Sequence, residues 1–299
     1  MELTELFDLF LQERKAAGLS VKTLEWYGYQ LKMFHRWLTE VGERNILARR
    51  TIERYLNARR DAGLQPNSVA GAHRSLRVFY AWLVEREYIA QSPVTDIKIK
   101  AVQRKVPRRA LLEDYERLLN SIEQGNWVDL RDRFLIKVLF LCGVRVGEAV
   151  ALSVDDLDVR SKLLAVNRGK TGGRLVPLLP AVIDEFIAYL YARPGVERKE
   201  LFLSAHGDKS VRGLITTNGV RQMLRRRCRA AGIPYLNPHS FRHGLAMYLL
   251  NRGGDMSMAQ RILGHSRIQT TAENYAQWIT EDLSREFAEK MNGVNRSAK

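Results

Sequence analysis

The stretch that decides both the fold and the chemistry of this chain is residues 239–275, HSFRHGLAMYLLNRGGDMSMAQRILGHSRIQTTAENY. It contains three of the six histidines in the sequence. His239 and Arg242 are three residues apart, so they share one face if the segment is helical. The apolar residues that follow predict a buried helix that holds this pair in place, and they are Leu245, Met247, Tyr248, Leu249 and Leu250.

The second half of this stretch predicts a short helix followed by a polar segment. Residues 258–263 have helical spacing and end at Gly264, a residue type suited to the left-handed turn that follows many helices. That turn would place His265 just beyond the end of the helix. Tyr275 follows in the polar segment.

These residue types suit chemistry on a phosphate. An arginine and two histidines can bind phosphate oxygens and stabilise additional negative charge on them. A tyrosine beside them can act as a nucleophile if a neighbouring group takes its proton or lowers its pKa from about 10. The stretch therefore predicts covalent chemistry at a phosphate ester.

A second arginine motif lies upstream, in CGVRVGEAVAL, residues 142–152. Gly143 and Gly147 flank Arg145, so the backbone can approach a ligand closely on both sides of it. We expect Glu148 to orient this arginine. A cation beside a buried helix is costly without an anionic partner, so a phosphate ligand is the favoured interpretation, and a purely structural Arg145–Glu148 pair is the alternative.

One region is predicted to form strands. Residues 163–166 and 174–178 are short β-prone runs, and the glycine-rich turn NRGKTGG connects them as a hairpin. Lys170 lies at its tip. Such a lysine is usually solvated, but an ammonium on a hairpin arm can also protonate a leaving oxygen.

A strongly basic helix is predicted over residues 218–230, NGVRQMLRRRCRA. Like charges three or four residues apart on a helix repel each other, and binding across a nucleic-acid groove would relieve that repulsion. The candidate DNA contacts on this helix are Arg221, Arg225, Arg226 and Arg227.

Residues 1–97 are predicted to form an all-helical domain. Gly18 separates its first two helices, and Ser20 is suited to cap the second. Asn67 or Ser68 is expected to cap the fourth. Three tryptophans are expected to pack in the core or between helices rather than stack on bases, and they are Trp26, Trp37 and Trp82.

Residues 98–109 are the predicted linker to a second domain, 110–299. The linker contains six basic residues and no acidic one. It is either a solvated hinge or a tether that lies against phosphates, and we favour the tether. Its candidate DNA contacts are Lys98, Lys100, Arg104, Lys105, Arg108 and Arg109.

The composition points to a polyanionic partner. The chain has 299 residues, a net charge of +15 and a pI of about 10.0. Cys142 and Cys228 show no CxxC spacing, so we expect neither a disulfide framework nor a zinc site. No apolar run is long enough to span a membrane and no signal-peptide pattern is present. We therefore expect a cytoplasmic, nucleoid-associated protein.

Together these segments resemble the tyrosine recombinases, the family of site-specific DNA recombinases that includes the phage integrases. The resemblance covers nearly the whole chain, and its length is similar to that of the compact Xer-type members. Residues 20–38 and 75–94 resemble the helical core-binding domain of the family. The motifs GVRVGEAVAL, GKTGG, HSFRHGLA, LGHS and TTAENY stand in the order that is typical of the family.

The resemblance implies a mainly α fold, with an N-terminal helical bundle and a mostly helical catalytic domain that contains a small antiparallel sheet. It implies cleavage of double-stranded DNA through a 3′-phosphotyrosine, without a metal or another cofactor. Glu148 would play a supporting role. The implied catalytic residues are Arg145, Lys170, His239, Arg242, His265 and the nucleophile Tyr275.

The end of the chain predicts a docking helix at about residues 280–291. Its apolar residues recur every four positions and must be buried against the same domain or against a neighbouring copy, which we favour. The family resemblance implies a homotetramer on two DNA sites. A partner recombinase or an accessory protein is also compatible with the sequence.

Three features depart from the family pattern. Gly244 stands where the family usually has Thr or Ser, and Phe241 replaces the commoner Leu. The spacing from His265 to Tyr275 is one residue longer than in Xer-type members. Tyr248 is the nearest competing tyrosine, and we expect it to be structural.

Two other functions remain open at this level. One is a type IB topoisomerase activity, which uses the same intermediate but rejoins the same strand. The other is a DNA-binding accessory protein without catalysis, which would need neither Tyr275 nor Lys170.

Overall fold

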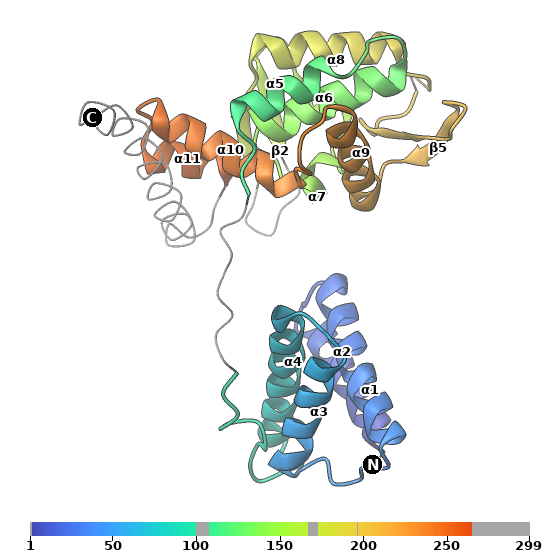
Figure 1. Cartoon of the computed structure of the whole chain (residues 1–299), viewed down its shortest axis with the longest axis vertical. Coiled ribbons are helices and arrows are strands. Elements are labelled where there is room, and N and C mark those ends of the chain that lie inside the picture. The colour runs from blue at the N-terminus through green and yellow to red at the C-terminus, as the bar shows by residue number, and fades with distance from the viewer. Residues whose placement is uncertain (1, 100–107, 167–172, 196, 265–299) are drawn as a thin grey trace, which may run out of the picture. The chain divides into compact units, whose positions relative to one another are not determined.

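The computed structural model of the chain describes residues 2–99, 108–166, 173–195 and 197–264 (Figure 1). The chain divides into two compact units, Met1–Arg104 and Lys105–Lys299, which are called the N-terminal and C-terminal units. Most of the predicted linker, residues 98–109, lies outside the described residues, so its boundaries stay a prediction. The predicted mainly helical fold with a small antiparallel sheet is confirmed.

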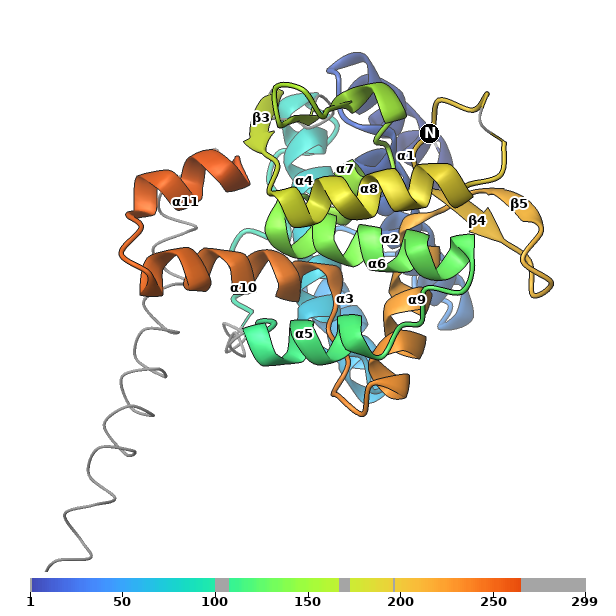
Figure 2. The same cartoon turned by 90° about the horizontal axis from the view of Figure 1, so that it is seen from above.

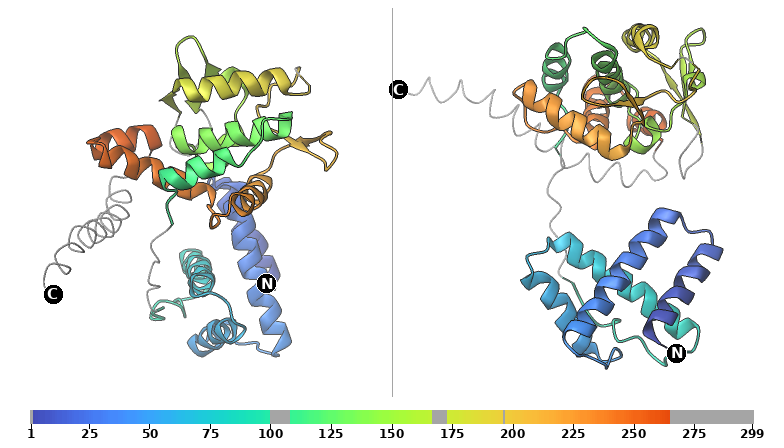
Figure 3. Two further views of the ribbon diagram at one scale, coloured as in Figure 1. Left: turned by 45° about the horizontal axis from the view of Figure 1, so that its top comes forward. Right: turned by 90° about the vertical axis from the view of Figure 1, so that its right-hand side faces the viewer.

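The N-terminal unit is a bundle of helices (Figure 3). Gly18 has a φ of 78° and ends the first helical segment, and the Ser20 side chain accepts a hydrogen bond from the Thr23 backbone N–H, as expected of a cap. The fourth helix instead begins at Pro66, without a side-chain cap, so the predicted cap at Asn67 or Ser68 is wrong. The helices are α1 (Leu3–Ala16), α2 (Val21–Glu40), α3 (Arg49–Asp61) and α4 (Pro66–Glu85).

Aromatic side chains fill the core of this unit. Phe10 packs edge-on against Phe79 and Trp82, with ring centroids 5.6 and 5.5 Å apart. Trp82 is buried, and its indole N–H donates to the Glu13 carboxylate at 2.9 Å. The predicted packing role of Trp82 is thus confirmed. Trp37 is half-buried but packs against the same core and against Tyr55 of α3, as predicted, and Trp26 is half-buried beside Tyr27.

The C-terminal unit is built around α6 (Trp127–Leu141), most of which is buried in the core of the unit. Figure 2 shows α6 between α8 and α5, with α10 running past its end. The remaining helices are α5 (Leu112–Asn120), α7 (Val146–Ala149), η1 (Val154–Asp156), α8 (Pro180–Ala192), α9 (Thr217–Ala230), α10 (Pro238–Asn251) and α11 (Met256–Leu263).

Two small antiparallel sheets complete this unit. The predicted hairpin is present, because β2 (Leu163–Val166) pairs with β3 (Arg174–Pro177), and Val166 is opposite Arg174. β1 (Leu157–Asp158) extends this sheet. The second sheet, β4 (Leu203–Ala205) with β5 (Val211–Leu214), was not predicted, since three- and four-residue strands with a bulge show no clear alternation.

The last described elements, α10 and α11, lie side by side and share a small apolar core of their own (Figure 2). Gly264 ends α11 with a φ of 63°, which confirms the predicted left-handed turn. Leu245 and Met247 are buried as predicted, but Tyr248 is 38% exposed and Arg252 lies over its ring. The predicted buried helix is thus buried on only one side here.

Cys142 and Cys228 are free and buried. Among the helices that the structure describes, none combines the length and apolar character that a membrane crossing requires.

Candidate active site and nucleic-acid interface

The site is built on the first two turns of α10. The Asn237 side chain caps this helix by accepting from the backbone N–H of His239 at 2.9 Å and of Ser240 at 3.2 Å. His239 and Arg242 therefore lie one turn apart on a rigid helix start, as the sequence predicted. His239 is exposed, whereas only 3% of Arg242 is exposed.

Arg242 connects α10 to two other helix ends. Its guanidinium donates one hydrogen bond to the carbonyl of Gly143, just after α6, and one to the carbonyl of Leu263, at the end of α11. A buried cation needs such partners. They fix its position without neutralising its charge.

Arg145 lies at the start of α7. Its backbone N–H and its guanidinium both donate to Glu148, at 2.7 and 2.8 Å, so the predicted pairing is present. A second guanidinium nitrogen donates to the carbonyl of Gly264 at 3.2 Å. The side chain is still 35% exposed, so solvent or a ligand can reach it.

Glu148 is shared by two arginines. Arg174, the first residue of β3, donates to both of its carboxylate oxygens, at 3.0 and 2.9 Å. Burial alone would raise the pKa of Glu148, but the hydrogen bonds from Arg174 and Arg145 outweigh it, and the pKa falls to about 2. Glu148 is therefore a permanent anion that orients two cations.

Sequence reasoning missed Arg174. Its Nε also donates to the carbonyl of Ile262 at 2.9 Å. Its only sequence signal is its place directly after a glycine-rich turn, at the start of a strand whose inward residues are apolar. A charged residue there must find a buried partner.

Three arginines thus bind three successive carbonyls at the end of α11. Arg174 binds Ile262, Arg242 binds Leu263 and Arg145 binds Gly264, which leads directly to His265 in the sequence. The C-terminal end of a helix carries partial negative charge and unpaired carbonyls, so it suits cationic donors. The arrangement brings Arg145 and Arg242 to adjacent peptide groups.

Both described histidines of this region have a lowered pKa. Partial burial lowers the pKa of His239, and the charges of Arg242, Arg145 and Arg221 lower it further. Burial, His239 and Arg242 lower the pKa of His243 to about 4. His239 is therefore mostly uncharged at neutral pH and can accept a proton.

The described part of the site has an excess of positive charge. Arg145 and Arg174 share a single carboxylate, Glu148, while Arg242 donates to the carbonyls of Gly143 and Leu263, and Arg221 is close enough to affect His239. No cluster of three or more metal-binding side chains occurs among the described residues. The arrangement suits an oxyanion such as a phosphodiester.

Comparison with known proteins decides the family. The family model described as "Phage integrase family" matches residues 109–281, and "Phage integrase, N-terminal SAM-like domain" matches residues 5–87. The chain belongs to the phage integrase family of tyrosine recombinases. It is therefore a recombinase, an enzyme that transfers DNA strands.

Individual relatives agree with this assignment. "Tyrosine recombinase XerD" of Pseudomonas putida is 33% identical over 85% of this chain and 86% of its own length, and that of Listeria monocytogenes is 31% identical over 85% and 87%. A structure of the XerH site-specific recombinase in a post-cleavage complex with its difH substrate has a TM-score of 0.73 and 21% identity, covering 92% and 82% of the two chains. A lambda integrase dimer bound to a core site has a TM-score of 0.70 and 19% identity, covering 90% and 97%. The two structures show that the fold is shared.

The arginines on α9 of this recombinase are not equivalent. Arg225 and Arg226 are exposed, and Arg225 lies over the ring of Tyr235 at 5.2 Å. Arg221 is half-buried near His239. These three stay candidate DNA contacts.

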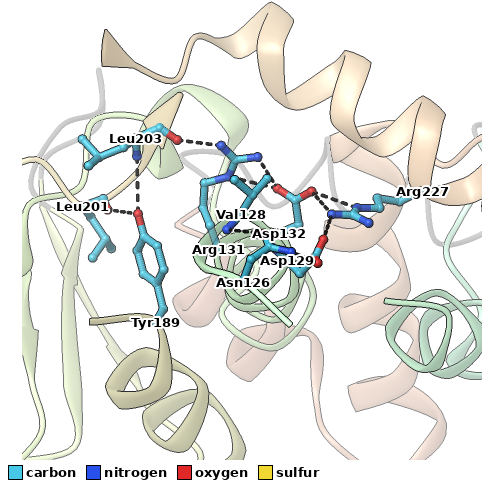
Figure 4. Close-up of polar contacts among 9 residues, drawn as sticks. All are labelled: Asn126, Val128, Asp129, Arg131, Asp132, Tyr189, Leu201, Leu203 and Arg227. Carbon is cyan, nitrogen blue, oxygen red and sulfur yellow. Dashed lines mark hydrogen bonds and ion pairs between the residues drawn. The ribbon is translucent and has the colours of Figure 1, made fainter. Parts of the chain in front are cut away.

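Arg227, by contrast, faces the interior. Its guanidinium donates to both Asp129 and Asp132, and Asp132 also accepts from Arg131 at 2.9 and 2.6 Å (Figure 4). Arg131 in turn donates to the carbonyl of Leu203 in β4 at 2.8 Å. We therefore assign Arg227 to a structural network of α6, α9 and β4, in place of the DNA contact expected from the sequence.

Two glycines of the motifs are needed for packing. At Gly244 a side-chain Cβ would lie 2.2 Å from the backbone oxygen of Ala110, which explains why the family's Thr or Ser is absent here. Gly143 has a φ of 59°, and a Cβ there would lie 2.7 Å from Leu263. The expected close approach of a ligand at Gly143 is therefore replaced by contacts within the protein, whereas Gly147 has open space around it.

The remaining candidate residues fall into two groups. Lys98 is exposed, Arg109 is half-buried, and Arg108 is exposed and pairs with Asp114 at 3.2 Å. Outside the described residues lie Lys100, Arg104, Lys105, Lys170, His265, Tyr275 and the docking helix 280–291.

Proposed function

We propose that this recombinase cleaves and rejoins double-stranded DNA at specific sites through a covalent 3′-phosphotyrosine on Tyr275. One observation carries the proposal. Arg145 and Arg242, which come from different helices, donate to the adjacent carbonyls of Gly264 and Leu263. Their charges therefore converge beside the residue that precedes His265 in the sequence.

In the proposed reaction the Tyr275 oxygen forms a bond to phosphorus while the bond to the 5′ oxygen breaks. Arg145, Arg242 and His265 would bind the non-bridging oxygens and stabilise the charge of the transition state. His239 would accept the phenolic proton or donate a hydrogen bond, and its lowered pKa suits the first role. Lys170 would protonate the leaving 5′ oxygen.

The exchange of strands would follow from this intermediate. The phosphotyrosine keeps the energy of the phosphoester, so a 5′ hydroxyl of a second duplex can attack it and release Tyr275. We propose that this occurs in a homotetramer on two DNA sites, with the helix at residues 280–291 docked on a neighbouring copy. This assembly is compatible with a partner recombinase or an accessory protein.

A nicked suicide substrate tests the nucleophile. Wild-type protein should form a covalent protein–DNA adduct, because the short strand beyond the nick diffuses away after cleavage. Tyr275→Phe should bind the same DNA but form no adduct. An adduct with Tyr275→Phe would show that another residue is the nucleophile, and no adduct with wild type would leave only an accessory DNA-binding role.

Relaxation of supercoiled plasmid separates the proposal from a topoisomerase. A recombinase should act only on plasmids that carry its site and should join two such sites. Relaxation of any plasmid by a monomer would favour the type IB alternative.

A further inference from the structure

Arg174 connects three parts of the C-terminal unit that lie far apart in the sequence. It starts β3, binds both oxygens of Glu148 in α7, and binds the carbonyl of Ile262 in α11. All three nitrogens of its guanidinium take part in these contacts. The side chain is 12% exposed, compared with 35% for Arg145.

This difference in exposure separates the roles of the two arginines. Arg145 is open to solvent on one side, so a phosphate can reach it. Arg174 is enclosed by Glu148, by Ile262 and by Gly264, where a Cβ would lie 2.8 Å from the Arg174 side chain. A group in that setting acts on its neighbours and not on the substrate.

We propose that Arg174 is a positioning residue for DNA cleavage. By binding Glu148 it fixes the carboxylate that orients Arg145, and by binding Ile262 it fixes the end of α11, from which the chain continues to His265. This inference rests on the proposed function, because it assumes that Arg145 binds the scissile phosphate.

The geometry requires an arginine. Two parallel hydrogen bonds to one carboxylate and a third to a carbonyl match the planar guanidinium, whereas an ammonium offers a single point charge. In Arg174→Lys the positive charge remains, but Glu148 and the end of α11 no longer have a fixed spacing. Misplacement by about 1 Å is enough to lower a reaction rate by about 100-fold.

Arg133 provides a matched control. Its Nε donates to Glu185 at 2.7 Å and its Nη1 to the carbonyl of Leu119 at 2.8 Å, and Glu185 is shared with Lys137 in the same way that Glu148 is shared with Arg145. Arg133 is 14% exposed, close to the value for Arg174. It lies among α5, α6 and α8, and its hydrogen bonds within the described structure reach neither Arg145 nor α11.

The experiment measures single-turnover adduct formation at saturating nicked DNA, together with DNA affinity and thermal unfolding. Arg174→Lys should lower the cleavage rate about 10- to 100-fold with DNA affinity within about twofold of wild type. Arg133→Lys should lower Tm similarly and leave the cleavage rate within about twofold. Equal cleavage rates for the two variants would overturn the inference, and no adduct with wild type would overturn the proposed function instead.

A double-variant cycle tests the route of the effect. If Arg174 acts through Glu148, Arg174→Lys combined with Glu148→Gln should cleave no more slowly than the slower single variant. Independent, multiplying losses would contradict that route. Arg174→Gln serves in both assays if Arg174→Lys does not fold.

Discussion

Two of the ion-pair clusters in the described part of the C-terminal unit, one around Asp132 and one around Glu148, differ in their charge balance. Around Asp132, two arginines, Arg131 and Arg227, meet two carboxylates, Asp129 and Asp132 (Figure 4). Around Glu148, the arginines outnumber the carboxylate, and backbone carbonyls of α11 supply the remaining acceptors.

The difference in charge balance indicates which of the two clusters can bind an anionic ligand. The charges of a balanced and largely buried cluster compensate each other, so the cluster needs no external anion. A cluster with surplus positive charge and a partly open arginine attracts an anion. Ion pairs alone therefore do not identify the site, whereas unbalanced charge beside an exposed cation does.

Removal of the Asp132 carboxylate from the balanced cluster should cause the largest change, a decrease in the free energy of unfolding. Asp132→Ala leaves the buried Arg131 and the half-buried Arg227 without their common partner, which costs about 3–5 kcal/mol of stability. Urea unfolding measures this decrease. The adduct yield per folded molecule should stay near that of wild type, and a selective defect in cleavage with normal stability would remove the distinction between the clusters.

The burial of His243 beside the positively charged site, which lowers its pKa together with the charges of His239 and Arg242, should appear in the pH dependence of the free energy of unfolding. His243 has a pKa of about 4 in the folded protein, well below its ordinary value, so the unfolded chain binds its proton first as the pH falls. Its contribution is complete above about pH 6.5 and disappears between about pH 6.5 and 4, by up to about 3 kcal/mol. His243→Gln should flatten this part of the curve of unfolding free energy against pH, and parallel curves for the two proteins would refute the assignment.

The smallest expected effect is on the salt dependence of DNA binding, and it distinguishes the exposed arginines of α9 from Arg227. Neutralising both Arg225 and Arg226 should weaken DNA binding and reduce the slope of log K against log salt by about 0.9 for each phosphate that the protein no longer binds. Arg227→Gln should leave the slope unchanged and lower Tm, because its partners are Asp129 and Asp132. A reduced slope for Arg227→Gln would return that residue to the interface.

Local sequence signals predicted much of the fold. Gly18, Ser20 and Gly264 end or begin helices as expected, since these signals act within a few residues. The cap of α4 was wrong because Pro66 itself starts the helix. The β4–β5 sheet was missed because its strands are too short for a visible alternation.

The site was predictable where its residues are neighbours in the sequence. His239 and Arg242 share one helix, and Arg145 and Glu148 share one turn, so spacing alone placed each pair. Arg174 was missed and Arg227 was placed among the DNA contacts because their partners are distant in the sequence, at Ile262 and at Asp132. The sequence shows that arginines are present but not which of them are already paired.

The close approach at Gly244 has an evolutionary consequence. The helix that carries His239 and Arg242 touches the backbone of Ala110 at this glycine, and the Ala110 N–H donates to the Ser240 carbonyl at 2.8 Å. Any ancestor or descendant that carried a hydroxyl-bearing residue at position 244 must have held the backbone at position 110 farther away. We therefore expect positions 110 and 244 to change together among homologues. A chimaera that combined this backbone at position 110 with a hydroxyl-bearing residue at position 244 would contain a steric clash.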